Sequence, residues 1–245
     1  MRPDRVTVVV PTYNERENLA DLARAVTDHG YRMLLVDDNS PDGTGDLADE
    51  LAGSNPLITV LHREAKQGLG RAYAAAFDHL LRSCSADIIV EMDADFSHDP
   101  SDLPRLVAAI EDGADLAIGS RYVPGGSTPD WPWHRKFLSR GGNLYARIML
   151  GHGVKDSTAG YRAFRAGALS RLPYREARAS GYGFQVEMAW KAAIAGMRIV
   201  EIPVVFRDRT RGTSKMGGSI VAEAMWLVTV WGIRNIPARL RRVGR

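Results

Sequence analysis

The chain of 245 residues contains a single cysteine, Cys84. One thiol cannot form an internal disulfide or supply a pair of zinc ligands, so a disulfide-stabilised scaffold and a cysteine zinc site are both excluded. The first residues, MRPDRVTVVVPT, lead directly into an apolar run and lack the organisation of a signal peptide. We therefore expect a reducing, cytoplasmic setting.

Long hydrophobic runs and several catalytic motifs are also missing. No uncharged apolar stretch reaches the roughly 18 residues that a membrane-spanning helix needs. The motifs G-x-x-x-x-G-K-[ST], H-E-x-x-H and G-x-S-x-G are absent, and QGLGRAY at 67–73 lacks the third glycine of a dinucleotide-binding loop. These absences argue against P-loop enzymes, zinc proteases, α/β-hydrolases and nicotinamide-dependent dehydrogenases.

The formal net charge is only +3, but four arginines fall within residues 239–245. Such a cluster favours an anionic neighbour, either a nucleic acid or a phospholipid surface. The basic residues of this chain are not interleaved with an aromatic stacking platform, so we expect no nucleic-acid binding.

Short, unbroken apolar runs alternate with amphipathic helical patterns in the first half of the chain, as in strands that are covered on both faces. The runs are 6–10, 33–36, 57–61, 87–92 and 115–119. Asn14 and Glu17 have the spacing of a capping box at the start of the first helix, and residues 99–102 form a second helix start. This order predicts a doubly wound α/β domain with a mostly parallel sheet.

The second half is less regular, with helices expected near 138–150 and 183–195, a strand at 198–206 and an apolar C-terminal helix. Four polar loops follow the predicted strands, at 11–17, 37–44, 93–100 and 120–127. Since the carboxyl ends of parallel strands meet at one edge of a sheet, we expect these loops to form one ligand site.

Asp93 and Asp95 flank Ala94 where a predicted strand ends. Neighbouring carboxylates in an extended turn can direct oxygens at one hard cation such as Mg²⁺ or Mn²⁺, which would also bind a ligand's phosphates. A strand that simply turns toward solvent would show the same residues. The acidic pair Asp37 and Asp38, after another strand, favours the site over the solvated turn.

Six segments occur in order between about residues 6 and 218: VVVPTYNERENL, LLVDDNSPDGT, KQGLGRAYAAAF, VEMDADFSHDP, AIGSRYVPGG and RDRTRGTSK. Together they resemble the dolichyl- or polyprenyl-phosphate mannosyltransferases of the family 2 inverting glycosyltransferases. The resemblance implies a GT-A fold, in which a Rossmann-like, mostly parallel sheet is flanked by helices. It also implies mannose transfer from GDP-mannose to a polyprenyl (dolichyl-type) monophosphate, with inversion and release of GDP. Alternatives are a transferase that uses a UDP-sugar and a non-enzymatic nucleotide-sugar or membrane-surface binding module.

The resemblance assigns roles to individual residues. Asp95, Arg121 and Arg135 would be catalytic, and Asp93, Asp95 and Ser97 would bind the metal, Mg²⁺ or Mn²⁺. An acceptor phosphate with a second pKa near ~6 is already largely dianionic at neutral pH, so no protein base is required, and Asp156 and Glu187 are auxiliaries at most. The donor would contact Pro11, Tyr13, Glu15, Asp37, Asp38, Asp93, Ala94, Arg209 and Lys215.

A polyprenyl phosphate resides in a bilayer, so the enzyme must reach the membrane surface. As a helix, residues 219–233 would span about 22 Å, short of the ~30 Å hydrocarbon core, which favours an amphipathic interfacial helix. Trp226, Trp231 and the arginine tail suit lipid headgroups, although packing on the catalytic domain or a partner protein is the alternative.

We expect a catalytic domain at 1–218, with a nucleotide-sugar half at 1–120 and an acceptor half at 121–218. Residues 219–245 would form the interface helix and basic tail of a peripheral protein on the cytoplasmic face, with a possible membrane-anchoring partner, and residues 207–218 a loop that closes over the donor.

Overall fold

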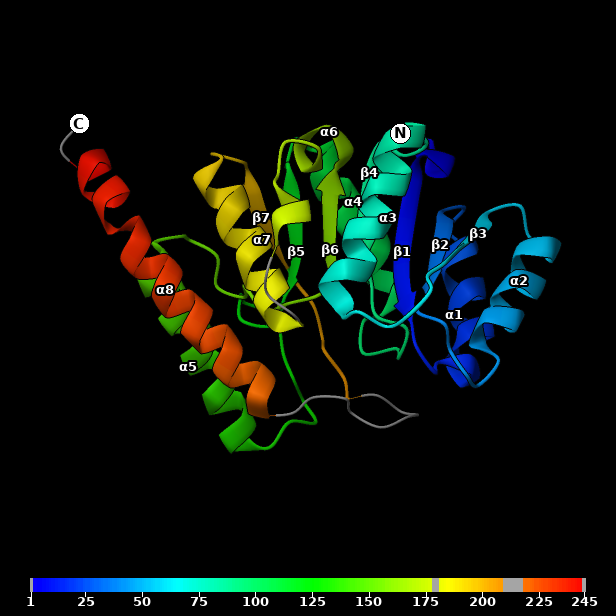
Figure 1. The fold of residues 1–245 in the computed structure, drawn as a ribbon, viewed down its shortest axis with the longest axis horizontal. Helices are drawn as coiled ribbons and strands as arrows, with labels where there is room; N and C mark the ends of the chain where they lie inside the picture. The colour runs from blue at the N-terminus through cyan, green and yellow to red at the C-terminus, as the bar shows by residue number, and fades with distance from the viewer. Residues whose placement is uncertain (1, 178–180, 209–217, 244–245) are drawn as a thin grey trace.

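The computed structural model describes residues 2–177, 181–208 and 218–243. Within these residues the chain forms a seven-stranded sheet in the order β3-β2-β1-β4-β6-β5-β7 (Figure 1). Among the described strands, only β6 runs antiparallel to its neighbours. The strands are β1 (Val6–Thr12), β2 (Arg32–Asp37), β3 (Ile58–His62), β4 (Ile88–Glu91), β5 (Leu116–Ser120), β6 (Arg162–Arg165) and β7 (Ile199–Pro203).

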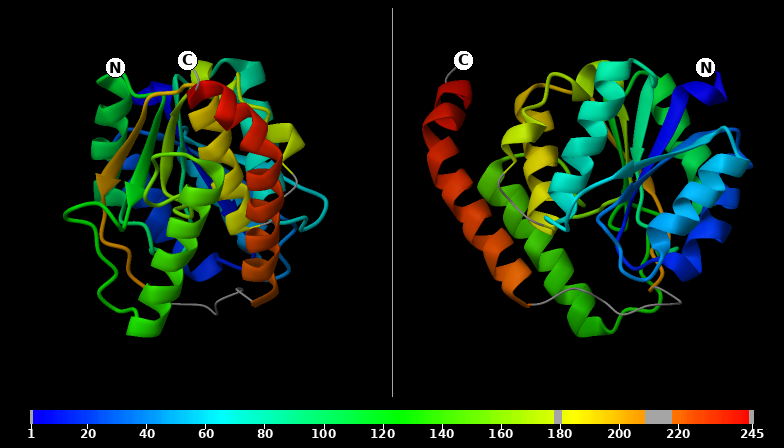
Figure 2. Two further views of the ribbon diagram at one scale, coloured as in Figure 1. Left: turned by 90° about the vertical axis from the view of Figure 1, so that its left-hand side faces the viewer. Right: turned by 45° about the vertical axis from the view of Figure 1, so that its right-hand side comes forward.

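Helices cover both faces of this sheet (Figure 2). The α-helices are α1 (Arg16–Thr27), α2 (Thr44–Ser54), α3 (Leu69–Ser83), α4 (Leu103–Glu111), α5 (Trp133–Leu150), α6 (Ala166–Leu169), α7 (Tyr182–Ile194) and α8 (Gly218–Val243), and the 3-10 helices are η1 (Pro3–Arg5), η2 (Pro100–Asp102) and η3 (Tyr174–Glu176). Side chains alternate along β1, so Val8 and Val10 pack with α1, α2 and α4, while Val9 packs with α3, α6 and α7.

The chain leaves β1 for β2 and β3 on one side and returns to β4 on the other. In a doubly wound sheet, ligands bind outside the carboxyl ends of the strands at the point where this direction changes. Here that point lies between β1 and β4, at the lower edge of the sheet in Figure 1. The predicted doubly wound, mostly parallel architecture is confirmed.

Strand β6 has no clear signal in the sequence, because two arginines, Arg162 and Arg165, interrupt its apolar pattern. Arg162 is nevertheless fully buried. Its guanidinium donates hydrogen bonds of 2.7 to 2.8 Å to three main-chain carbonyl oxygens, those of Ser157, Ala159 and Gln185. These bonds satisfy the buried charge and fix the segment that precedes β6.

The two predicted helix starts have different outcomes. At residues 99–102, the Asp99 carboxylate accepts a hydrogen bond of 2.9 Å from the main-chain N–H of Ser101, so this start is confirmed. The capping box on Asn14 and Glu17 is wrong. Asn14 has a φ of 58°, α1 begins only after Glu15, and no side chain caps it. The β1–α1 loop must reach across to the β2–α2 loop, and this requirement overrides the local capping preference.

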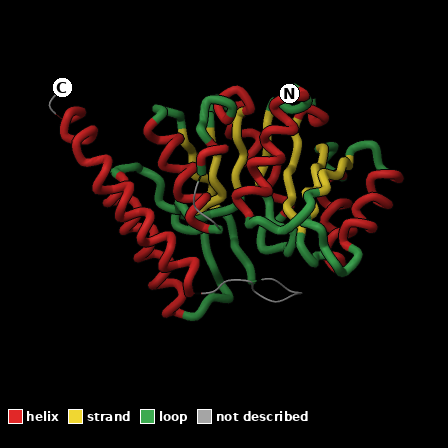
Figure 3. The backbone as a smooth tube through the Cα atoms, viewed as in Figure 1, coloured by secondary structure: helices red, strands yellow, loops and turns green. Residues whose placement is uncertain are grey.

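Helices α5 and α8 lie side by side at one end of the sheet (Figures 1 and 3). Val228 of α8 packs against Ala146 and Leu150 of α5, and the Trp231 ring stacks on Trp190 of α7 with centroids 5.6 Å apart. Helix α8 extends to Val243, beyond the expected end at residue 233. One side of α8 is therefore packed on the domain, and the division at residue 218 stays a prediction. None of the described helices has the length and apolar content that a membrane crossing requires.

Candidate active site

Hydrogen bonds tie together the loops that follow β1 and β2. The Thr12 hydroxyl donates to the Asp37 carboxylate at 3.3 Å, and the main-chain N–H of Glu15 donates to the Thr44 hydroxyl at 3.1 Å. Asp37 also accepts from Ser40, at 2.6 Å from the hydroxyl and 3.1 Å from the main-chain N–H. Asp37 thus braces this edge of the sheet, and its predicted contact with a nucleotide stays a prediction.

The next acidic residue, Asp38, forms an ion pair with Arg63, and both side chains are largely buried. Burial raises the pKa of Asp38, and the attraction to Arg63 offsets only part of that rise. On the same loop as Arg63, the Lys66 ammonium lies 4.0 Å from the centre of the Tyr13 ring. An aromatic face and a carboxylate therefore line the outer end of β1 and β2. The predicted donor residues at this end are Pro11, Tyr13, Glu15, Asp37 and Asp38.

The loop after β4 holds Asp93 and Asp95 in a fixed turn. The main-chain N–H of Asp93 donates to Nδ1 of His98 at 3.1 Å, and that of Ser97 donates to the Asp95 carboxylate at 3.0 Å. The His98 ring stacks on Tyr161 with centroids 4.8 Å apart. The histidine thus fixes the acidic loop, a role that its position in the sequence alone did not reveal.

The side chains of this loop fit a hard divalent cation. The Ser97 hydroxyl, two positions after Asp95, is buried and has no hydrogen-bond partner among the described residues. Across the described ranges, no group of three or more His, Cys, Asp or Glu side chains is arranged to hold a metal. Mg²⁺ commonly uses only one or two protein carboxylates and takes its other ligands from water and substrate phosphates. The donor set of Asp93, Asp95 and Ser97 therefore suits a cation that binds together with a diphosphate.

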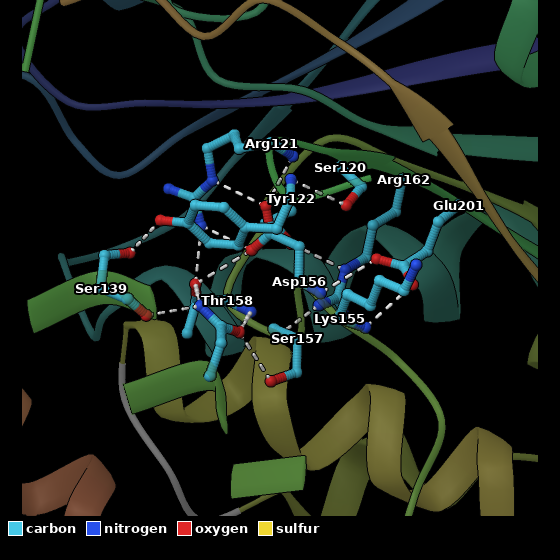
Figure 4. Close-up of polar contacts among 12 residues, drawn as sticks. Ser120, Arg121, Tyr122, Ser139, Lys155, Asp156, Ser157, Thr158, Arg162 and Glu201 are labelled. Atoms are coloured by element: carbon cyan, nitrogen blue, oxygen red, sulfur yellow. Dashed lines mark hydrogen bonds and ion pairs between the residues drawn. The ribbon is translucent and has the colours of Figure 1, made fainter. Parts of the chain in front are cut away.

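Arg121, directly after β5, is held in a buried ion pair with Asp156 (Figure 4). Its Nε and Nη2 donate to the two Asp156 oxygens at 2.7 and 2.6 Å, and its main-chain N–H donates at 2.9 Å. Nη2 also donates to the Thr158 hydroxyl at 2.7 Å. The side chains of Arg121 and Asp156 are 5% and 0% exposed, so the guanidinium is fixed before any ligand arrives.

Asp156 is itself anchored from β7, because Glu201 accepts hydrogen bonds of 2.8 and 2.9 Å from the main-chain N–H groups of Lys155 and Asp156. Burial alone would raise the pKa of Asp156, but the charge and hydrogen bonds of Arg121 outweigh burial and lower it. Asp156 is therefore ionised and braces Arg121. The other auxiliary, Glu187, pairs with Lys191 one turn along α7, with their charged atoms 2.7 Å apart.

Two cavities meet at Arg121 and Thr158, which line both. The larger cavity, of about 160 Å³, is lined by α5 and α8 and is mostly apolar, with Arg135 and Ser139 among its polar side chains. The smaller cavity, of about 40 Å³, is lined by Asp93 of the acidic loop. A ligand held by the acidic loop and one held between the helices would thus approach each other at Arg121.

Arg135 lies in the first turn of α5 and lines the larger cavity. Its Nη1 donates to both oxygens of Asp208, at 2.9 and 3.0 Å, and its guanidinium lies 3.9 Å from the centre of the Trp131 ring. Arg209 and Lys215, predicted near the donor, lie outside the described residues. The same is true of most of the predicted closing loop, 207–218.

The structure brings the central predicted residues to one edge of the sheet. Asp93, Arg121 and Arg135 line the two adjoining cavities. Several residues that shape this site were given no individual role from the sequence, because single serines, threonines and charged residues are common. They are Arg63, Ser139, Thr158 and Asp208.

The sheet, its helices and the acidic loop after β4 define a class of protein. Residues 7–172 match the model of the family described as glycosyl transferase family 2, and the chain belongs to this family. The resemblance in the sequence is thereby confirmed at the level of the family, and the protein is a glycosyltransferase.

Two curated relatives are similar over almost their whole length. The chain is 50% identical to the polyprenol monophosphomannose synthase of Mycolicibacterium smegmatis, over 100% of this chain and 94% of that protein. It is 51% identical to the undecaprenyl-phosphate mannosyltransferase of Micrococcus luteus, over 94% of each.

Solved structures share the fold at much lower identity. Glucosyl-3-phosphoglycerate synthase of Mycobacterium tuberculosis, in complex with Mn²⁺, UDP and glucosyl-3-phosphoglycerate, has a TM-score of 0.68 at 20% identity, over 91% of this chain and 79% of that chain. A mannosyltransferase of Pyrobaculum calidifontis, in complex with GDP-Man and Mn²⁺, has a TM-score of 0.54 at 19% identity, over 97% and 75%. These similarities support the expected GT-A fold.

Proposed function

We propose that this protein transfers mannose from GDP-mannose to a polyprenyl monophosphate, with inversion at the anomeric carbon. The observation that carries the proposal is the meeting of a small cavity at the acidic loop and a larger apolar cavity at one buried cation, Arg121. The names of the two relatives at about half identity, a polyprenol monophosphomannose synthase and an undecaprenyl-phosphate mannosyltransferase, support both the sugar and the acceptor class.

The donor would lie along the carboxyl ends of β1, β2 and β4. Tyr13 offers a ring on which a nucleobase can stack, and the Asp38 carboxylate offers acceptor oxygens that match the adjacent N–H donors of guanine. A divalent cation, Mg²⁺ or Mn²⁺, bound by Asp93, Asp95 and Ser97 would stabilise negative charge on the departing GDP. The Mn²⁺ complexes of the two structural neighbours support such a cation.

The acceptor would place its first isoprene units in the larger cavity between α5 and α8. Arg121 and Arg135 would hold its phosphate, since guanidinium groups bind phosphate oxygens in pairs. The phosphate is largely dianionic at neutral pH and needs no base. One of its oxygens bonds to the anomeric carbon as the bond from that carbon to the β-phosphate oxygen of GDP breaks. The commitment of Asp156 to Arg121 supports a reaction without a protein base.

The acceptor's residence in a bilayer requires a membrane-facing surface. Helix α5 exposes five large apolar side chains, and four of them are spaced by four, seven and four residues, which places those four along one side of the helix. Trp226 of α8 is also 69% exposed. We call these residues the apolar patch: Trp133, Phe137, Leu144, Ile148 and Trp226. The patch supports peripheral binding to a membrane. We propose that the binding is to the cytoplasmic face, with or without a membrane-anchoring partner protein.

The proposal is tested by turnover of the purified full chain. Radiolabelled GDP-mannose, Mn²⁺ or Mg²⁺ and a polyprenyl monophosphate in detergent are expected to yield labelled lipid that extracts into organic solvent. Chelator should abolish the product. Labelled UDP-glucose serves as the competing donor, and faster transfer from it would replace GDP-mannose in the proposal.

A further inference from the structure

The carboxylate of Asp208 binds the guanidinium of Arg135, as a phosphate group would. Both of its oxygens lie within 3.0 Å of Nη1 of Arg135, and its Oδ1 accepts a hydrogen bond of 3.0 Å from the indole N–H of Trp131. We propose that Asp208 is an internal substitute for the acceptor phosphate, which competes with it for Arg135 and sets its affinity. This inference rests on the proposed function, because it assumes that the larger cavity takes a phosphorylated lipid.

Arg135 remains in position when Asp208 leaves it. Its guanidinium lies over the ring of Trp131, which is only 7% exposed, and Trp131 in turn packs edge-on against Phe206. The ring contact is a cation–π interaction that does not consume the N–H donors in the guanidinium plane. A departing carboxylate would therefore leave these donors ready for another anion.

Exposure makes this ion pair displaceable. The Arg135 and Asp208 side chains are 39% and 43% exposed, whereas those of Arg121 and Asp156 are 5% and 0% exposed. Half-exposed ion pairs contribute little net stability, whereas removing one partner of a buried pair is strongly destabilising because the other charge stays buried. A dianionic phosphate carries more charge than a carboxylate and has an additional oxygen, so it can displace Asp208 while Arg121 stays fixed.

The substitute also has a consequence for the product. The product is a phosphodiester with a single negative charge, and it must leave the same guanidinium. When Asp208 returns, it re-forms the ion pair and again balances the charge of Arg135. Asp208 therefore weakens the binding of both acceptor and product and favours release after transfer.

A purely structural role for Asp208 predicts the opposite change in phosphate affinity when Asp208 is replaced. If Asp208 served to orient Arg135, its loss would weaken phosphate binding. If it competes with phosphate, its loss tightens phosphate binding. Asp130 provides a matched control, because it carries the same charge in the adjoining loop but accepts a hydrogen bond from the main-chain N–H of Asp208, at 3.4 Å, in place of an ion pair with Arg135 within the described residues.

The experiment is calorimetric titration of the full-length protein with farnesyl monophosphate as the probe. Asp208→Asn is expected to bind the probe roughly threefold to tenfold more tightly than wild type, the factor that an ion pair of this exposure and one hydrogen bond contribute. Asp130→Asn should match wild type, and thermal unfolding should confirm that both variants fold.

Equal or weaker binding by Asp208→Asn overturns the inference. The failure of the proposed function looks different. If wild type does not bind farnesyl monophosphate, the acceptor class is wrong and both conclusions fall. If wild type binds the probe and Asp208→Asn does not tighten it, only the role of Asp208 is wrong.

Discussion

The two halves of the cleft are built in different ways. At the donor end, neighbouring loops are joined by hydroxyl–carboxylate hydrogen bonds such as Thr12 to Asp37, and the Arg63 and Asp38 side chains of its ion pair are 11% and 8% exposed. At the acceptor end, the ion pair of Arg121 and Asp156 is almost completely buried. The acceptor end also carries the exposed apolar patch.

Under the proposed function, this difference follows from what each half binds. A nucleotide brings its own hydrogen-bonding groups, so a regular sheet edge with short polar loops is sufficient to hold it. A lipid phosphate must be taken from a membrane and held against a second anion, which requires cations fixed in a water-poor site. Buried charge and exposed apolar surface are both costly, and among the described residues the acceptor end carries both.

The largest expected effect lies at the donor end. Asp95→Asn removes a charged oxygen from the proposed cation site, and we expect turnover to fall at least about 100-fold because the departing diphosphate loses its stabilisation. The measurement is labelled-lipid formation at saturating substrates, with circular dichroism to confirm the fold. Activity within a few-fold of wild type, still sensitive to chelator, would place the cation elsewhere.

The second effect contrasts the buried ion pair of Arg121 and Asp156 with the half-exposed pair of Arg5 and Asp87, which lies at the opposite edge of the sheet. Asp156→Ala leaves Arg121 buried without its partner and is expected to lower the free energy of unfolding by about 3 to 5 kcal/mol. Asp87→Ala breaks the half-exposed pair with Arg5 and should cost no more than about 1 kcal/mol. Urea denaturation of both variants gives the comparison, and similar losses of stability would show that burial does not set the cost of breaking these two ion pairs.

The third effect concerns acid stability at the acceptor end. Burial, together with Arg162 and Arg147, lowers the pKa of His152 to about 4, below its ordinary value of 6.5. As the pH falls from 6.5 toward 4, the unfolded chain gains a proton there that the folded chain does not, so stability falls by about 2 kcal/mol. His152→Leu should remove this part of the pH dependence. The measurement is urea denaturation of wild type and variant at pH 7 and at pH 4.5. The same difference in unfolding free energy between the two proteins at both pH values would contradict the assignment.

The smallest effect tests whether the exposed apolar patch of the acceptor end binds membranes. Phe137→Ser, in the apolar patch, should weaken binding to vesicles that contain anionic phospholipid by roughly tenfold, as expected for the loss of one buried aromatic side chain. Ile194→Ser is the control, since Ile194 is 40% exposed but lies at the end of α7. Equal losses in a vesicle sedimentation assay would show that the patch has no special role.

The sequence reveals the donor end more fully than the acceptor end. Unbroken apolar runs predict β1 to β5, and the polar loops at their carboxyl ends predict the positions of Asp38 and Asp93, because strand period and sheet topology are local and regular. Arg121 is also found in this way, since it directly follows β5.

The acceptor end depends on contacts between distant segments. Asp156 lies 35 residues from Arg121, and Asp208 lies 73 residues from Arg135, so no local spacing marks either pair. Strand β6 is not predicted because an arginine such as Arg162 is normally expected at the surface. Only the structure shows that Arg162 is buried and donates hydrogen bonds to main-chain carbonyl oxygens. Helix α5 begins at Trp133, five residues before its expected start, which conceals the apolar patch in the sequence.

The central claim is that donor and acceptor meet at Arg121. It is tested most directly by a crystal structure of the protein with a non-hydrolysable GDP-mannose analogue, Mn²⁺ and a short-chain isoprenyl monophosphate. We predict a phosphate oxygen of the acceptor about 3 to 3.5 Å from the anomeric carbon, opposite the GDP and in contact with Arg121. An acceptor phosphate bound away from Arg121, or on the same side of the sugar as the diphosphate, would contradict the account.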